Sequence, residues 1–135
     1  KILPADWSIQ FNATVTAAIY EIPGTVAIIQ QLKKAGYITA LLSNVIEEKA
    51  DVIRQLGYYK LFQPNLLSCE IGLEKPSPEA FSMLLQALDL PSNAVIFVDD
   101  KIQNVEVARA QGIDSILFIS AEQLTEDLRE RGITF

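Results

Sequence analysis

A short apolar run that ends in two acids most strongly limits what this chain can fold into. Residues 95–98 (VIFV) are apolar throughout, as in a strand buried on both faces, and Asp99 and Asp100 follow directly. Residues 101–112 then read as a helix that ends at a glycine. This order is typical of open α/β sheets, which bind ligands at the carboxyl ends of their strands. Two like charges there need a cation, a shared proton or water, and Mg2+ suits such oxygen ligands.

Strands and helices alternate along the rest of the chain. Apolar residues recur at helical spacing in four further segments, which are 24–35, 47–56, 78–88 and 121–131. Short apolar strands are expected at 37–43, 66–69, 94–98 and 114–119. Ser77 and Pro78 suit the first positions of the helix at 78–88. The β-α-β-α order predicts an α/β protein with a doubly wound parallel sheet and right-handed crossovers.

The first twenty residues fit two patterns. Ile9, Phe11, Ala13 and Val15 alternate as in a strand. Apolar residues between positions 11 and 19 also fit one face of a helix, and a helix over residues 12–20 is the favoured interpretation.

Composition excludes several classes of function. The 135 residues make one domain with a sizeable core, and the net charge of −6 disfavours nucleic acid or an anionic membrane as a partner. No apolar run approaches the length of a membrane span. The single cysteine, Cys69, cannot form an internal disulfide, so a cytoplasmic location fits. Because the chain has no histidine, Ser-His-Asp and Cys-His catalysis are excluded.

Two further features accompany the acid pair, and each has an ordinary alternative. Ser43 and Asn44 end an apolar strand, where a hydroxyl and backbone amides suit a phosphate oxygen, but Asn44 with Glu47 also makes a helix-capping box. Lys75 follows a strand and precedes a proline, so it either enters a shared cleft or stays solvated on the surface.

The acid pair has its own alternative. Asp100 with Gln103 is again a capping box, which would explain Asp100 but not Asp99. Asn104 either orients one of the acids or faces solvent.

In this order and spacing the motifs resemble the haloacid dehalogenase-like (HAD) superfamily. The resemblance runs from about residue 22 to the carboxyl terminus. It rests on the segments LLSN, EKPSPEAF and FVDDxxxNVxxAxxxG, which contain Ser43-Asn44, Lys75 and Asp99-Asp100 with Asn104.

The resemblance implies a role for each matching residue. Ser43 and the backbone amide of Asn44 would bind a phosphoryl oxygen, and Lys75 would neutralise charge on the transferring group. Asp100 and Asp99 would hold Mg2+, with Asn104 in support. Positioning and charge neutralisation are also what phosphoryl transfer needs. The paired aspartates look more like those of the Mg2+-dependent phosphatases than those of the dehalogenases.

One motif of the superfamily is absent. Its first strand ends in Asp-x-Asp, which supplies the nucleophile and the acid/base, and this chain contains no Asp-x-Asp. The simplest expectation is a core that lacks its first strand and most of its cap, with residues 1–20 a cap remnant or linker and residues 21–135 the core domain. Another chain or fragment, a swapped segment, or residues 8–15 of this chain would then fill the gap.

The sequence therefore predicts a Mg2+-dependent phosphatase of a small phosphorylated metabolite that is inactive in this form. The alternative is a non-catalytic HAD-like binding or scaffold domain that keeps the phosphate and metal cradle. Neither hypothesis identifies the substrate.

Overall fold

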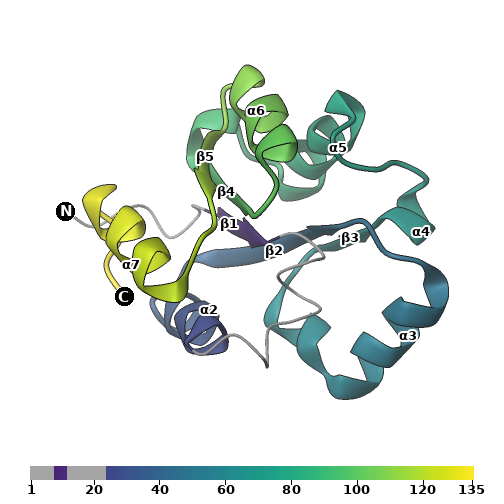
Figure 1. Ribbon diagram of the computed structural model, residues 1–135, viewed down its shortest axis with the longest axis horizontal. Coiled ribbons are helices and arrows are strands. Elements are labelled where there is room, and N and C mark those ends of the chain that lie inside the picture. Colours follow the sequence, from purple (N-terminus) through teal and green to yellow (C-terminus); the bar gives the residue numbers. More distant parts are fainter. Residues whose placement is uncertain (1–7, 12–23) are drawn as a thin grey trace.

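The computed structural model describes residues 8–11 and 24–135. Its centre is a parallel sheet of five strands in the order β3-β2-β1-β4-β5 (Figure 1). The strands are β1 Ser8–Phe11, β2 Ile38–Ser43, β3 Asn65–Leu67, β4 Val95–Asp99 and β5 Asp114–Leu117. The α-helices are α2 Thr25–Lys34, α3 Glu47–Leu56, α4 Ser68–Ile71, α5 Pro78–Leu88, α6 Ile102–Ala110 and α7 Ala121–Glu130. Two 3-10 turns, Tyr58–Leu61 and Ser92–Ala94, precede β3 and β4.

The central position of the sheet belongs to β1. Phe11 pairs with Leu41 of β2 on one side and with Val98 of β4 on the other. The expectation that the sheet lacks its first strand is therefore corrected, because the third of the expected occupants, a stretch of the chain's own amino-terminal segment, fills the gap. The helix expected at residues 12–20 lies outside the described residues, as does the rest of residues 1–20.

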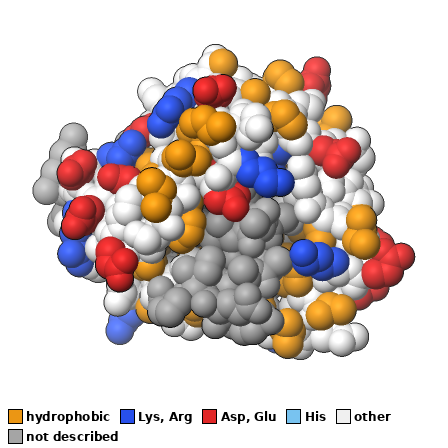
Figure 2. All heavy atoms as spheres, in the orientation of Figure 1, with side chains coloured by type: hydrophobic (Ala, Val, Ile, Leu, Met, Phe, Trp, Pro, Cys, Tyr) orange, Lys and Arg blue, Asp and Glu red, His pale blue; other side chains and the backbone are white. Residues whose placement is uncertain are grey.

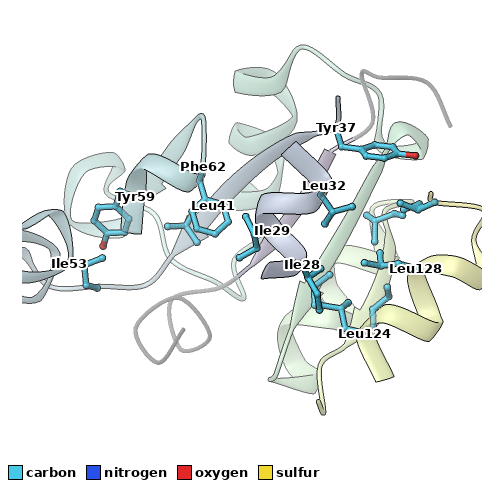
Figure 3. Close-up of a cluster of buried hydrophobic side chains, with 14 of the residues drawn as sticks. Ile28, Ile29, Leu32, Tyr37, Leu41, Ile53, Tyr59, Phe62, Leu124 and Leu128 are labelled. Carbon is cyan, nitrogen blue, oxygen red and sulfur yellow. The ribbon is translucent and has the colours of Figure 1, made fainter. Parts of the chain in front are cut away.

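Helices cover both faces of the sheet, as the doubly wound arrangement requires. Residues alternate between the two faces along a strand. Leu41 therefore joins the core beneath α2, α3 and α7, while its neighbour Leu42 joins the core beneath α5 and α6. Figure 3 shows the first of these cores, where Ile28 of α2 lies close to Leu124 of α7. On the other face the rings of Phe81 and Phe97 meet edge to face, with centroids 5.1 Å apart.

Local sequence signals place most element ends within one or two residues of expectation. Ser77 is the N-cap residue of α5 and a proline follows in its first turn, although the Ser77 side chain makes no capping hydrogen bond to the described backbone. The strand expected at residues 66–69 is wrong in its second half, because β3 ends at Leu67 and α4 starts at Ser68. A capping box between Ser120 and Gln123 starts α7.

Two surface properties complete the description. Among the described helices, none is long and apolar enough to cross a bilayer. Figure 2 shows acidic and basic side chains interspersed over the described part of one face.

Candidate functional site

The carboxyl edge of the sheet holds a buried ion pair. Lys75 lies in the loop between α4 and α5, and its Nζ is 3.3 Å from Oδ2 of Asp99, the last residue of β4. Only 2% of the Lys75 side chain and none of the Asp99 side chain is exposed. The alternative of a solvated surface lysine is therefore wrong.

Three donors among the described residues hold the Asp99 carboxylate. Its Oδ1 accepts the backbone N–H of Lys101 at 2.8 Å, and its Oδ2 accepts Nδ2 of Asn104 at 3.0 Å in addition to Lys75. Asn104 is buried in the first turn of α6, so of its two expected roles it takes that of orienting an acid. These bonds fix the carboxylate where β4 ends and α6 begins.

The electrostatic state of Lys75 reflects two opposing influences. Burial lowers the pKa of Lys75 to about 8, and this effect is larger than the opposing attraction of Asp99 and Asp100. The Nζ atom also lies 5.9 Å from the centroid of the Phe97 ring. Asp100 is half-buried and close enough to act on the lysine electrostatically.

The residues after β2 do not form the helix-capping box that the sequence offered as an alternative. The N-cap residue of α3 is Ile46, which makes no side-chain capping bond. Asn44 instead donates Nδ2 to the backbone O of Lys75 at 2.9 Å and accepts the backbone N–H of Lys75 at Oδ1, also at 2.9 Å. A capping box between Asn44 and Glu47 is therefore excluded.

The second capping hypothesis is also wrong. The N-cap residue of α6 is Lys101, and its side chain makes no capping hydrogen bond to the described backbone. Asp100 precedes the N-cap position, so a capping box with Gln103 does not account for it.

Ser43 carries a hydroxyl that no described residue satisfies. It is the last residue of β2, only 1% of it is exposed, and its Oγ has no hydrogen-bond partner within residues 8–11 and 24–135. A buried hydroxyl without a partner is costly, so its position at the end of a strand suits an incoming acceptor or donor.

Sequence reasoning missed one anchor of this edge. Oγ of Ser68 accepts the backbone N–H of Val45 at 2.9 Å and donates to the Val45 carbonyl at 3.2 Å. Together with the Asn44 bonds, this joins the loop after β2 to the segment after β3. The only signal in the sequence was a hydroxyl residue at the end of a weak strand, which many surface residues share.

The acid pair can be tested against Mg2+ by its donor chemistry. Among the described residues, no group of three or more acidic, cysteine or histidine side chains gathers that could hold a metal. Mg2+ in proteins often takes only one or two carboxylates, and waters and substrate phosphates complete its shell. Asp99 already accepts three hydrogen bonds, so Asp100 is the better ligand of the two. The pair fits a weakly held Mg2+ whose shell other oxygens complete.

Comparison with known proteins decides the family. A family model for haloacid dehalogenase-like hydrolases matches residues 5–112. The chain belongs to that family. The HAD match includes β1 as well as the motif residues from Ser43 to Asn104, so the amino-terminal strand is part of the family's core.

Individual relatives agree with this assignment. The bifunctional epoxide hydrolase 2 of Mus musculus is 30% identical over 135 residues, which cover 95% of this chain and 24% of the relative. The glyceraldehyde 3-phosphate phosphatase of Pyrococcus furiosus is 26% identical over 113 residues, which cover 82% of this chain and 47% of the relative. The chain thus spans less than half the length of either HAD relative.

A solved structure matches the chain over almost its whole length. An uncharacterized protein from Corynebacterium glutamicum is 26% identical, with a TM-score of 0.78 and coverage of 95% of this chain and 96% of that one. The chain therefore shares nearly its entire HAD-like architecture with this protein.

The position of β1 changes the interpretation of the absent motif. The resemblance places Asp-x-Asp at the end of the first strand, and β1 ends at Phe11. The next residues in the sequence are Asn12, Ala13 and Thr14, which lie outside the described residues. The sequence positions that directly follow β1 thus carry an amide and a hydroxyl side chain and no carboxylate.

Proposed function

We propose that the carboxyl edge of the sheet is a phosphoryl-binding site of the kind that Mg2+-dependent phosphatases of small phosphorylated metabolites use, in a chain that is inactive in this form. The observation that carries this proposal is the buried Lys75–Asp99 pair at the end of β4. The Pyrococcus furiosus relative is a phosphatase named for a small phosphorylated metabolite, glyceraldehyde 3-phosphate, and this supports the same class of ligand.

Each residue has a role that follows from its chemistry. The Lys75 ammonium offsets the negative charge of a phosphoryl group, and Asp99 with Asn104 holds the lysine in place. The Ser43 hydroxyl donates to a phosphoryl oxygen and so gains a partner that the described residues do not provide. Asp100, with Asp99, would hold Mg2+, which when bound neutralises charge on the phosphoryl oxygens.

We further propose that this chain binds a phosphate ester without hydrolysing it. In the mechanism that the family resemblance implies, a carboxylate next to the bound group attacks phosphorus. Asn12 and Thr14 follow β1 in the sequence, and neither can supply one. This observation favours the second candidate function, a non-catalytic HAD-like binding domain.

A binding experiment tests the first proposal. We expect inorganic phosphate to bind in the presence of Mg2+ by isothermal titration calorimetry, and Lys75→Met to weaken that binding at least about tenfold. Methionine keeps an unbranched stem and removes the charge together with the N–H donors of the ammonium. Lys33→Met, at an exposed lysine of α2, is the matched control and leaves binding unchanged. Equal affinity in the wild-type and Lys75→Met chains would refute the site.

The metal assignment gives a separate expected result. Mg2+ should raise the melting temperature of the wild-type chain, and Asp100→Asn should remove that rise, because an amide lacks the charge that a hard cation requires. Asp89→Asn removes the same charge at the carboxyl end of α5 and should leave the rise intact. An unchanged Mg2+ response in the Asp100 variant would exclude Asp100 as a ligand.

A further inference from the structure

Both polar atoms of the Asn44 side chain form hydrogen bonds to the backbone of one residue, Lys75. Its Oδ1 accepts the Lys75 N–H and its Nδ2 donates to the Lys75 carbonyl, both at 2.9 Å. The side-chain amide thus pairs with the Lys75 backbone as one strand residue pairs with another. The two residues are 31 positions apart in the sequence.

These bonds hold the backbone of Lys75, whose side-chain ammonium is the positive charge of the proposed site. Lys75 lies in a loop, where no helix or sheet ladder fixes the backbone. Its ammonium must nevertheless stay 3.3 Å from Asp99 while almost fully buried. Asn44 follows directly on the last residue of β2. Its two bonds to the Lys75 backbone, which we call the clamp, therefore tie the loop to the sheet. The side-chain end is fixed by Asp99 and the backbone end by Asn44.

We infer that Asn44 is a positioning residue that acts on the phosphoryl group through Lys75 rather than through a side-chain contact of its own. This inference rests on the proposed phosphate site. It assigns the Asn44 side chain to the lysine, whereas the role that the family resemblance implies belongs to the Asn44 backbone amide. Loss of the clamp should weaken phosphate binding because the ammonium is no longer held at one place.

A double-mutant cycle separates action through Lys75 from direct contact. Asn44→Ala, Lys75→Met and the double variant are titrated with inorganic phosphate and Mg2+. We expect Asn44→Ala to weaken binding about tenfold. The double variant should bind no more weakly than Lys75→Met alone, within about twofold, because two residues that act as one unit are not additive. Additive losses would overturn the inference and indicate direct contact.

Asn65→Ala is the matched control for loss of structure. Nδ2 of Asn65 donates to the Tyr59 carbonyl at 3.2 Å, so this side chain also ties a backbone segment, but it lies in β3 away from Lys75. The control should lower the melting temperature without changing phosphate affinity by more than about twofold. An equal loss of affinity in Asn65→Ala and Asn44→Ala would overturn the inference.

Hydrogen exchange of the Lys75 backbone amide tests whether Asn44 holds this backbone when phosphate affinities cannot be measured. If the wild-type chain binds no phosphate, the proposed function fails, but the clamp can still be tested. Asn44→Ala should speed exchange of the Lys75 N–H at least about tenfold, whereas Asn65→Ala should not. Unchanged Lys75 exchange in Asn44→Ala would show that the clamp does not hold this backbone. The same measurement applies if Lys75→Met binds too weakly to complete the cycle.

Discussion

The double variant Asn12→Asp/Thr14→Asp should have Mg2+-dependent phosphatase activity, which the wild-type chain should lack. The two changes restore the order of carboxylates that the family carries after its first strand, and they supply a nucleophile and an acid/base. Turnover of a generic phosphate monoester, followed by release of inorganic phosphate, is the measurement. In the restored background, Lys75→Met should then lower the rate by about 10²–10³, because it removes one preorganised charge-stabilising group.

The control adds the same two charges at the opposite edge of the sheet. Asn93 lies in the turn that precedes β4, and the backbone N–H of Thr134 bonds the hydroxyl of Tyr37, which precedes β2. Asn93→Asp with Thr134→Asp should therefore give no activity. Turnover by the wild-type chain, with contaminating phosphatases excluded, would mean that the nucleophile lies elsewhere. A folded but inactive Asn12→Asp/Thr14→Asp variant would mean that these positions do not correspond to the family's motif.

Replacing Asp99 with alanine should lower the free energy of unfolding by about 3–5 kcal/mol. The change leaves the buried Lys75 ammonium without its ion-pair partner, and breaking a buried pair from one side costs far more than the pair itself contributes. It also removes the acceptor for Asn104 and for the N–H of Lys101. Urea unfolding monitored by circular dichroism measures the difference.

An exposed ion pair provides the comparison. Asp114 accepts Nε of Arg131 at 2.7 Å, with 49% of its side chain exposed. Asp114→Ala should cost about 0–1 kcal/mol, because solvent already screens that pair. If Asp99→Ala and Asp114→Ala cost the same, the Lys75–Asp99 pair is not isolated from water and its proposed role in the site loses support.

The parts of the fold that follow from local chemistry were predictable from the sequence. The helix at 78–88 has a serine and a proline at its start and a strong apolar stripe, and α5 has the bounds that these signals indicate. The strand that ends at Asp99 was equally clear, because a short fully apolar run followed directly by two acids fits few other structures. These signals lie within a few residues of each other, so no tertiary contact is needed to interpret them.

The central strand and the site contacts were not predictable in the same way. Ser8–Phe11 is short, and its alternation competes with a helical pattern that starts in the same segment. Pairing with two neighbouring strands settles the conflict, and a sequence pattern contains no record of such pairing. The Asn44–Lys75 bonds likewise join distant residues, so the local capping signal at Asn44 pointed to a nearer and wrong partner.

The place of β1 in the sheet also sets the order in which the chain can assemble during synthesis. This strand is made before both of its partners, because Ser8 pairs with Ile38 on one side and with Val95 on the other. While a ribosome is still adding residues, β1 can meet β2 early, but its second edge stays open until β4 has emerged. Such long-range parallel pairing is slow and leaves a strand edge exposed to wrong partners. The nascent chain should therefore need protection, by a chaperone or by rapid elongation, until Val95–Asp99 has left the exit tunnel.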